Sequence, residues 1–245
     1  MNIGLIGYGR MGRLIEEVAK ERDHNIVSYF TSKDPLKSID QLEGIECLID
    51  FSNPDAVAGS IALAFEAGQN ILVGTTGWDK KILGEYADIS KSAIFVSPNF
   101  SIGVNLFLSI VENASKLLDA AGGYDVAIRE IHHKEKLDSP SGTALKIAEK
   151  IIESSSSKSN IITDSQGGKV PDDSIRITSE RIGDEVGTHE VLYESEVETM
   201  TFRHQMKDRN AFALGALTAA EWLRGRTGIL GFEDYLREEF NFNRD

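Results

Sequence analysis

The part of the sequence best suited to chemistry is segment 130–144, Glu-Ile-His-His-Lys-Glu-Lys-Leu-Asp-Ser-Pro-Ser-Gly-Thr-Ala. Its adjacent histidines, His132 and His133, titrate near neutral pH, and histidine is the usual donor or acceptor of protons in enzymes. Lys136 adds an ammonium group in the same segment. A proton donor beside a cation predicts a pocket for a small carboxylate.

The end of this segment has the features of a helix start. Residues 144–151 place apolar side chains at helical spacing, and Pro140 suits the first helical turn. Ser139 or Ser141 could serve as the N-cap. Because the first N–H groups of a helix lack partners inside it, they form a binding site for an anion. We predict that this turn binds a substrate carboxylate through Ser141, Gly142 and Thr143.

A strand must position the histidines. Tyr124–Ile131 alternates well enough for a strand, so His132 and His133 would leave its end and enter a loop. Adjacent residues of an extended segment point to opposite sides, so spacing alone does not say which imidazole faces a substrate. Two histidines in a charged loop also suit an ordinary solvated surface, and the rest of the chain has to decide between the two interpretations.

The N-terminal residues combine a short apolar strand at Asn2–Ile6, a glycine-rich turn and a helix. This context, with its G-x-G-x-x-G spacing, is typical of dinucleotide binding. Gly7 would allow the tight turn, Gly9 the approach of a pyrophosphate, and Gly12 close packing of the helix on the strand. We predict that NADH or NADPH contacts the whole turn: Gly7, Tyr8, Gly9, Arg10, Met11 and Gly12.

The residues after a second predicted strand, Asn25–Phe30, bear on the choice of cofactor. A site that prefers NAD usually has an acidic residue here for the ribose hydroxyls, whereas this chain has Thr-Ser-Lys-Asp at 31–34. Lys33 could pair with the 2′-phosphate of NADPH, or it could be a solvated loop lysine. We predict that either cofactor is used, with a preference for NADPH.

Further strands at Glu46–Phe51, Asn70–Val73 and Ala93–Val96 alternate with helices at Pro54–Ala67 and Asp79–Ala87. Such alternation predicts a parallel, doubly wound sheet, which binds ligands beyond the carboxyl ends of its strands. We therefore predict additional cofactor contacts from the residues at these ends: Phe51, Ser52, Gly74, Thr75, Thr76, Ser97, Pro98, Asn99 and Phe100.

After Ser101 the pattern changes. We expect a helix at Val104–Leu118, a flexible polar loop at Ser154–Asn160, and strands of an open, mostly antiparallel sheet at Ser174–Ile182, Thr188–Glu196 and Glu198–His204, with Gly183 and Gly187 at the turn between the first two. Asn210–Arg224 is predicted to be a helix.

Together these patterns predict an α/β protein of two domains. A Rossmann-type doubly wound parallel sheet in residues 1–103 and 213–245 would bind the dinucleotide. An inserted α+β domain with an open mixed sheet, residues 104–212, would bind the substrate and form contacts between subunits, because an uncovered sheet face would otherwise stay exposed.

Composition excludes several classes of function. The net charge is −13, from 26 basic and 39 acidic residues, which argues against binding to nucleic acid or an anionic membrane. No apolar run approaches the roughly twenty residues of a membrane span, and the chain begins with a strand instead of a signal peptide, so we expect a cytoplasmic protein. With five histidines and one cysteine, Cys47, at poor ligand spacing, we expect no metal.

Segment 130–144 resembles the signature E-x-H-H-x-x-K-x-D-[AS]-P-S-G-T-A of the dihydrodipicolinate reductase family, also called 4-hydroxy-tetrahydrodipicolinate reductases. The resemblance covers nearly the whole chain. It extends to Gly-Arg-Met-Gly at 9–12, Asp-Phe-Ser at 50–52, Gly-Thr-Thr-Gly at 74–77, Asn-Phe-Ser at 99–101, Arg-Ile-Gly at 181–183 and Gly-Thr-His at 187–189. The chain departs from the family pattern in a glycine turn that is one residue shorter than in many members, in Ser97-Pro98, and in Thr31-Ser32-Lys33.

The resemblance implies a homotetrameric NAD(P)H-dependent reductase of the diaminopimelate route to lysine. Its substrate, 4-hydroxy-tetrahydrodipicolinate, is a small cyclic imine with two carboxylates, and it is reduced to tetrahydrodipicolinate with loss of water. The family pattern makes His132 the proton donor and Lys136 its cationic assistant. His133 and the helix-start turn would bind the carboxylates.

Two alternatives remain at this stage. Another Rossmann reductase with an inserted β domain, such as a homoserine or sugar dehydrogenase, would lack the histidine–lysine segment. A regulator that senses a nicotinamide cofactor without catalysis would be expected to have a basic DNA-binding module, and none is visible in the sequence.

Overall fold

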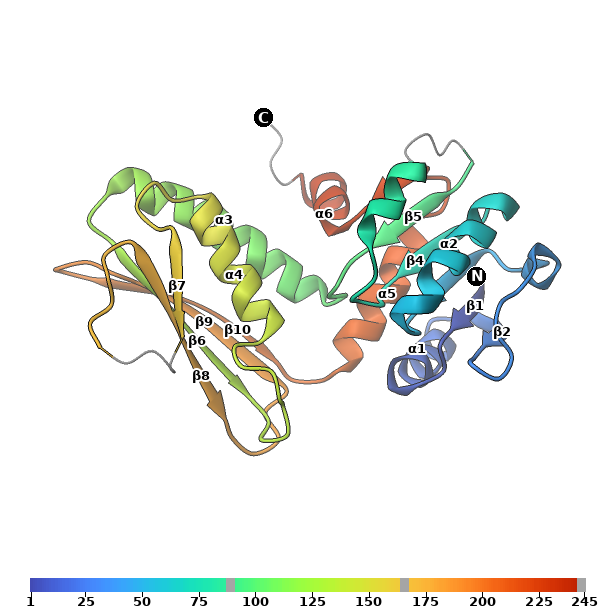
Figure 1. Cartoon of the computed structure of the whole chain (residues 1–245), viewed down its shortest axis with the longest axis horizontal. Helices are drawn as coiled ribbons and strands as arrows, with labels where there is room; N and C mark the ends of the chain where they lie inside the picture. The colour runs from blue at the N-terminus through green and yellow to red at the C-terminus, as the bar shows by residue number, and fades with distance from the viewer. Residues whose placement is uncertain (87–90, 164–167, 242–245) are drawn as a thin grey trace. The chain divides into compact units, whose positions relative to one another are not determined.

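The computed structural model describes residues 1–86, 91–163 and 168–241. The chain divides into two compact units (Figure 1): Met1–Asn105 with Asn210–Asp245, and Leu106–Arg209. The predicted boundaries, at 103/104 and 212/213, lie within a few residues of these. The chain therefore leaves the first unit and returns to it, as expected for an inserted domain.

The first unit contains a parallel sheet of six strands in the order β11-β5-β4-β3-β1-β2. The strands are β1 (Asn2–Ile6), β2 (Asn25–Phe30), β3 (Cys47–Asp50), β4 (Asn70–Val73), β5 (Ala93–Val96) and β11 (Gly228–Leu230). All five neighbouring pairs are parallel, so the carboxyl ends of the strands lie at one edge. The predicted doubly wound sheet is confirmed, and β11 is a short strand that the sequence pattern did not predict.

The helices of this unit cover the sheet, whose central strands are buried, as parallel strands usually are. They are α1 (Arg10–Glu21), α2 (Pro54–Ala67), α5 (Asn210–Trp222) and α6 (Phe232–Phe240), with 3₁₀ turns η1 (Ile39–Leu42) and η2 (Lys80–Tyr86). The helix predicted at Asp79–Ala87 is thus a 3₁₀ segment, and Ala87 lies outside the described residues. None of the helices in the described part of the chain has both the length and the apolar character of a membrane span.

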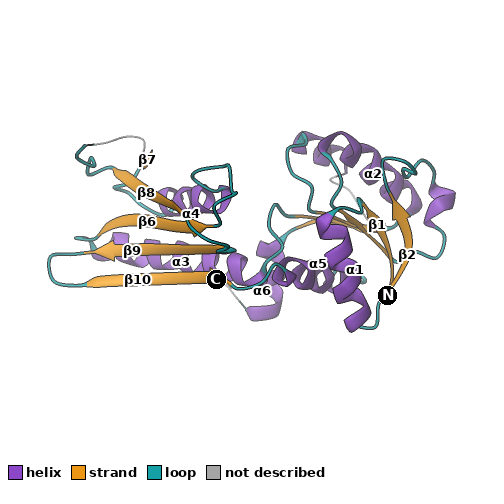
Figure 2. Ribbon diagram, turned by 90° about the horizontal axis from the view of Figure 1, so that it is seen from below, coloured by secondary structure: helices purple, strands orange, loops and turns teal. Residues whose placement is uncertain are grey.

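The second unit contains a mixed sheet of five strands in the order β10-β9-β6-β8-β7. They are β6 (Asp125–His132), β7 (Asn160–Thr163), β8 (Ser174–Arg181), β9 (Gly187–Glu194) and β10 (Thr199–Met206). Figure 2 shows α3 (Ile102–Ala121) and α4 (Gly142–Glu153) on one side of this sheet. Apolar residues of both helices form a single core with β6, β8 and β9. Among the described residues of this unit, no helix covers the other face of the sheet (Figure 2).

The expectation of a mostly antiparallel sheet was wrong. The β6–β8 and β7–β8 pairs are parallel, and only β6–β9 and β9–β10 are antiparallel. Gly183 and Gly187 do not mark a hairpin, because β6 lies between β8 and β9. Instead, segment 182–186 crosses the end of β6, where the Ile182 N–H donates to the His132 carbonyl at 2.9 Å. The sequence pattern shows that two strands exist but does not show that a third separates them.

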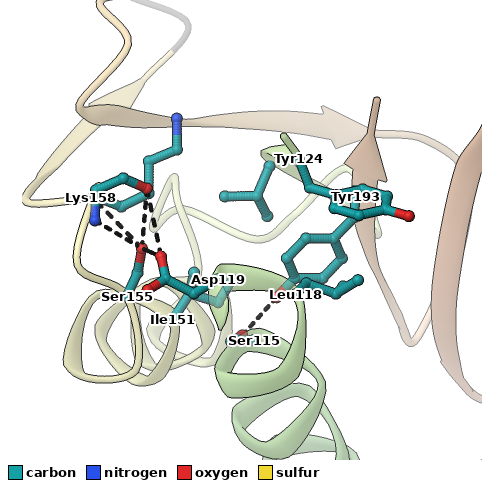
Figure 3. Close-up of a pocket in the computed structure, with 10 residues that line it drawn as sticks. Ser115, Leu118, Asp119, Tyr124, Ile151, Ser155, Lys158 and Tyr193 are labelled. Atoms are coloured by element: carbon teal, nitrogen blue, oxygen red, sulfur yellow. Dashed lines mark hydrogen bonds between the residues drawn. The ribbon is translucent and has the colours of Figure 1, made fainter. Parts of the chain in front are cut away.

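The segment Ser154–Asn160, predicted as a flexible loop, is tied down by hydrogen bonds, and β7 begins at Asn160. The Asp119 carboxylate accepts from the Ser155 hydroxyl at 2.7 Å. The Lys158 ammonium is buried and lies 2.5 Å from the Asp125 carboxylate. Figure 3 shows Asp119, Ser155 and Lys158 around a small cavity at the end of the unit where β6 begins.

Candidate active site

The predicted chemistry lies at the carboxyl end of β6. Val126, Ile128, Glu130 and His132 alternate with exposed or half-buried residues, so all four point to the face that α3 and α4 cover. The first two are core residues. Glu130 is completely buried and His132 is nearly so. The alternation of β6 therefore places a carboxylate and an imidazole side by side at the edge of the core.

Groups from three strands and from the start of α4 surround the Glu130 carboxylate. Its Oε1 accepts hydrogen bonds from the Ser141 N–H at 3.1 Å and from Arg181 Nη2 at 2.9 Å. Its Oε2 lies 2.9 Å from His132 Nδ1 and 3.9 Å from His189 Nε2. The Oε2–Nδ1 contact is at ion-pair distance but bent, since neither atom makes an aligned hydrogen bond with a described group. Strands β6, β8 and β9 and the start of α4 thus converge on one buried carboxylate.

The charge state of this cluster follows from its contacts. Burial alone would raise the pKa of Glu130, but its contacts with His132, Ser141 and Arg181 outweigh burial and hold that pKa well below its usual range. Burial, aided by the neighbouring His132, lowers the pKa of His189 from 6.5 to about 4. At neutral pH the cluster therefore contains a carboxylate anion and a neutral His189.

The helix start differs in two respects from the prediction. Ser141 is the N-cap, since its Oγ accepts from the Ala144 N–H at 3.2 Å, and Pro140 lies before the helix instead of in its first turn. The Ser141 N–H is already used by Glu130. Among the described residues, the N–H groups of Gly142 and Thr143 have no acceptor, and these two form the anion site that remains.

Lys136 lies in the loop between β6 and α4, next to the same cluster. Its Nζ lies 2.8 Å from a carboxylate oxygen of Asp138, whose side chain is mostly exposed. Its carbonyl accepts a 3.4 Å hydrogen bond from Arg181 Nε, the arginine that also binds Glu130. The ammonium group is thus within reach of solvent and anchored near His132 by its backbone.

His133 is placed apart from His132. It follows the end of β6 and faces Arg209, whose Nη2 lies 3.1 Å from His133 Nε2. The opposite orientation of the two histidines follows from the extended backbone. The structure therefore brings together His132, Lys136 and the α4 start, while His133 belongs to a second group with an arginine that the sequence prediction did not include.

The glycine turn of the first unit has the packing that a dinucleotide site requires. A Cβ atom at Gly7 or Gly12 would overlap backbone atoms, of Phe51 and of Gly7 respectively, whereas one at Gly9 would meet nothing within 4 Å. Gly9 is the N-cap of α1, and no side chain caps that helix. Two glycines thus permit the close packing and the third leaves open space beside free N–H groups, which fits a bound pyrophosphate.

The other side chains of the predicted turn lie around it. Arg10 and Met11 begin α1, and the Tyr8 hydroxyl donates to Glu16 on the same helix. Lys33 is exposed in the turn after β2, where the Thr31 hydroxyl accepts from its N–H at 3.3 Å. Among the described residues the Lys33 ammonium has no partner, so it is accessible to a ligand.

Asp50 joins two of the predicted cofactor loops. It is completely buried at the end of β3, and its Oδ1 accepts from the Ser52 hydroxyl at 2.7 Å and the Thr75 hydroxyl at 2.8 Å. Its Oδ2 has no hydrogen-bond partner among the described residues. Asp50 thus positions Ser52 and Thr75, while the adjacent Thr76 is exposed.

Two phenylalanines have different surroundings. The Phe51 ring packs so closely on Gly74 that a Cβ there would overlap it. Phe100 is buried among aromatic side chains and touches Phe51, with ring centroids 5.5 Å apart. Within the same turn, the Ser97 hydroxyl donates to the Asn99 carbonyl at 2.7 Å, and Pro98 is exposed. Phe51 can face a cofactor, and Phe100 supports it from the core.

Comparison with known proteins identifies the family. The family model described as dihydrodipicolinate reductase, N-terminus, matches residues 1–100, and the one described as dihydrodipicolinate reductase, C-terminus, matches residues 103–236. The chain belongs to the dihydrodipicolinate reductase family. It is therefore an oxidoreductase, and its cofactor is NADH or NADPH, as in the enzymes of this family.

Relatives and a solved structure agree with this placement. The 4-hydroxy-tetrahydrodipicolinate reductase of Christiangramia forsetii is 40% identical, with 98% of this chain and 99% of the relative covered. That of Archaeoglobus fulgidus is 35% identical, with 93% and 96% covered. A dipicolinate-bound dihydrodipicolinate reductase from Paenisporosarcina sp. TG-14 has a TM-score of 0.78 at 22% identity, covers 94% of this chain and 97% of its own, and shares the fold.

Three members of the β6 cluster were missed as site residues by the sequence prediction. Glu130, Arg181 and His189 all lie in motifs that resemble the dihydrodipicolinate reductase family, but no role was given to them. Their convergence depends on β8 and β9 flanking β6, which spacing along the chain does not reveal. The one available signal was a glutamate at a position that strand alternation places in the core.

The prediction that no metal takes part remains a prediction. One donor atom each from Glu130, His132 and His189 lies within 4.8 Å of the others. However, the guanidinium of Arg181 and the Ser141 N–H already compensate the Glu130 charge. We therefore assign these side chains to proton chemistry and not to metal binding.

Proposed function

We propose that the protein reduces 4-hydroxy-tetrahydrodipicolinate to tetrahydrodipicolinate in the diaminopimelate route to lysine. One NADH or NADPH and one proton are consumed, and one NAD⁺ or NADP⁺ and one water are formed. The family membership supports the reaction. The observation on which the proposal mainly rests is the buried His132 beside an anion, next to a helix start with free N–H groups.

The first unit would hold the cofactor, which supplies the hydride when bound. The glycine turn and the free N–H groups at the start of α1 suit the pyrophosphate. The loops at Phe51, Gly74 and Asn99 follow β3, β4 and β5, at the sheet edge where such ligands bind. Neighbouring Ser52, Thr75 and Thr76 add hydroxyl groups.

The substrate carboxylates need positive groups that the overall charge of −13 does not supply. The Gly142 and Thr143 N–H groups can bind one carboxylate, with Lys136 exchanging its exposed Asp138 partner for it. Ser141 contributes as the N-cap that orients this turn. His133, beside Arg209, offers a second cationic site.

His132 is the proposed proton donor. Arrival of a hydride at the conjugated ring of the substrate builds negative charge, which a general acid quenches. A histidine near neutral pH suits this task, and the Glu130 anion stabilises its protonated form. Lys136 assists as a nearby cation.

The test uses freshly generated cyclic imine and follows the loss of absorbance of the reduced nicotinamide. We expect His132→Gln to lower kcat by about 10²–10⁴-fold with little change in cofactor affinity. The matched variant His133→Gln should act mainly through KM. If the wild-type protein bound the cofactor without reducing the imine, the proposal would be refuted and a sensor would be favoured. If His133→Gln lowered kcat while His132→Gln acted mainly through KM, the roles of the two histidines would be reversed.

The cofactor preference is part of the same proposal. Lys33 is exposed beyond β2, near the place where an adenosine ribose binds in such folds. Lys33→Ala should therefore weaken NADPH binding several-fold and leave NADH binding nearly unchanged, as measured by fluorescence titration. An equal loss for both cofactors would make Lys33 a surface residue.

We further propose a cytoplasmic homotetramer whose partner is a small dicarboxylate, without nucleic acid or membrane. The acidic charge supports the last two points. The uncovered face of the mixed sheet supports contacts between subunits, because Ala127 and Leu192 lie on it among charged side chains.

A further inference from the structure

Glu130 has a geometry that a merely structural carboxylate would not need. Its Oε1 is occupied by the Ser141 N–H and the Arg181 guanidinium, from two different elements. These two contacts fix the plane of the carboxylate and leave Oε2 directed at His132 Nδ1, 2.9 Å away. The side chain is completely buried, so water does not compete for that oxygen.

We propose that Glu130 is a positioning residue that selects the protonated nitrogen of His132 and stabilises the imidazolium. This inference rests on the proposed role of His132 as the proton donor. A carboxylate facing Nδ1 favours a hydrogen on that atom, so the proton that His132 gives up comes from Nε2. Nε2 then serves the substrate, and Nδ1 stays attached to Glu130 through each turnover.

The surroundings of Nε2 agree with this assignment. The Gly187 backbone lies against that side of the ring, and a Cβ atom added there would lie 3.0 Å from Nε2. A glycine therefore leaves room at the reacting nitrogen, whereas any larger residue would press on it. The carbonyl of His132 is also tied to segment 182–186 through Ile182, which fixes the backbone under the ring.

His189 does not compete with His132 for the Glu130 carboxylate. The two histidine rings are 5.2 Å apart in an edge-to-face arrangement, and His189 Nε2 lies 3.2 Å from the Ser141 hydroxyl. Burial lowers the pKa of His189 to about 4, so it stays neutral near pH 7. A neutral neighbour neither repels the imidazolium nor competes for the anion as a cation would.

The other charged and titratable groups near His132 come from each element packed around it. They are His133, which follows His132; Arg181 on β8 and Asp138 in the next loop, which interact with Glu130; and His204 on β10 and Lys136, which interact with His189. In segment 182–186, Glu185 binds the Thr188 hydroxyl and the Gln205 amide instead. Glu130 lies at ion-pair distance from His132 Nδ1, whereas the carboxylate of Asp138 pairs with Lys136.

The experiment is a histidine ¹⁵N NMR titration of the full chain, free of substrate and cofactor, with signals assigned by single His→Gln variants. In the wild type we expect neutral His132 to carry its hydrogen on Nδ1. In Glu130→Gln we expect the midpoint of His132 titration to fall by about one pH unit or more, because an opposite charge is lost. Glu180→Gln is the matched control, since Glu180 on β8 is an exposed carboxylate that pairs with Arg129 on β6.

Kinetics give the second readout. A general acid works only while protonated, so the alkaline limb of the kcat profile should move to lower pH by the same amount in Glu130→Gln, with cofactor affinity unchanged. Above that limb, kcat falls about tenfold for each unit of the shift. Glu130→Asp, which keeps the charge, should move the limb back toward that of the wild type.

The outcomes separate the two proposals. A wild-type His132 with its hydrogen on Nε2 would overturn the positioning role, even if the glutamine variant failed to fold. A folded Glu130→Gln variant with unchanged titration would overturn it as well. Failure of the wild type to reduce the imine would refute the proposed function. The NMR result would still test the contact between Glu130 and His132, because it needs no turnover.

Discussion

At the scale of single residues, the site depends on charges that are paired before any ligand arrives. Glu130 is anionic because Arg181 and the Ser141 N–H surround it, and a buried carboxylate without such partners would instead take up a proton. His189 shows the opposite case, because burial keeps it neutral. Two buried groups a few ångströms apart thus both resist protonation, Glu130 as an anion and His189 as a neutral ring, and each has a consequence that can be measured.

His189 should make the protein less stable in mild acid. Its pKa in the folded chain is about 4, against 6.5 when exposed, so as the pH falls through this range the unfolded chain takes up a proton that the folded chain does not. The free energy of unfolding should therefore decrease from about pH 6.5 toward pH 4. Urea unfolding at several pH values should show a shallower decrease for His189→Gln. Parallel curves for the two proteins would contradict this.

Gly9 should be needed for the cofactor and not for the fold. A Cβ atom there meets nothing within 4 Å, so Gly9→Val should fold, yet its side chain would occupy the space left for the pyrophosphate. We expect at least a tenfold loss of affinity for both NADH and NADPH by fluorescence titration, with an unchanged circular dichroism spectrum. Gly59→Ala, in open space on α2, is the control that should bind normally. Wild-type affinity in Gly9→Val would remove the glycine turn from the site.

At the scale of elements, the site is made from ends of strands and starts of helices. The carboxyl end of β6 supplies Glu130 and His132, β8 supplies Arg181 at its own end, and α4 supplies the N–H groups of its first turn. In the first unit, β1, β3 and β4 end at the same edge and present Gly7, Asp50 and Gly74. Strand ends suit this purpose because the sheet fixes their backbone while the next residues are free to face a ligand.

The opposite end of the mixed sheet has a structural role. Lys158, which Figure 3 shows at the cavity, is buried. Its Nζ contacts the Asp125 carboxylate, and it donates to the backbone carbonyl of Asp172 at 2.6 Å. Asp125 begins β6 and His132 ends it, so this contact is a full strand away from the proposed chemistry. Its loss should affect stability and leave the active site in place.

Lys158→Ala should lower the free energy of unfolding by about 1–3 kcal/mol, because the carbonyl of the buried Ser174 loses its donor and the contacts to Asp125 and Asp172 are lost. The kcat of the folded variant should equal that of the wild type. Urea unfolding and the reductase assay together test this, with the exposed Lys146→Ala on α4 as the control for removing a lysine. A large loss of kcat at unchanged stability would instead link this end of the sheet to catalysis.

At the scale of the whole molecule, the uncovered sheet face of the second unit is the feature with the widest consequence. Arg129 pairs there with Glu180 at 2.7 Å and with Glu190 at 3.4 Å, and Arg203 pairs with Glu190 at 3.3 Å. Complementary charges of this kind set register and partner choice when two copies of a surface meet. We therefore expect this face to form the contacts of the proposed homotetramer.

Arg129→Glu should disrupt that assembly, because it would place like charges beside Glu180 and Glu190 in every copy. Sedimentation velocity should show a larger species for the wild type and smaller species for the variant at the same concentration. Arg237→Glu on α6, an exposed charge reversal in the first unit, should sediment like the wild type. A monomeric wild type would refute the assembly, and an unchanged Arg129→Glu variant would place the contact elsewhere.

Much of this protein could be predicted from local sequence. Apolar runs and helical spacing predicted the doubly wound sheet, and glycine spacing in a strand–turn–helix context predicted the dinucleotide turn, because both signals lie within a few neighbouring residues. The segment 130–144 likewise brings His132, Lys136 and the α4 start together within one loop. Its resemblance to the dihydrodipicolinate reductase family was confirmed by comparison.

Only the tertiary structure decided which residues surround His132. Arg181 and His189 lie about fifty residues along the chain and reach Glu130 because β8 runs parallel and β9 antiparallel to β6. Strand order is set by long-range packing against α3 and α4, and the pattern of each strand is the same whichever neighbour it takes. The same contacts turned the Ser141 N–H from an expected substrate ligand into a support for Glu130. Local sequence thus predicted His132 as a site residue, whereas the order of the strands determined which residues surround Glu130 beside it.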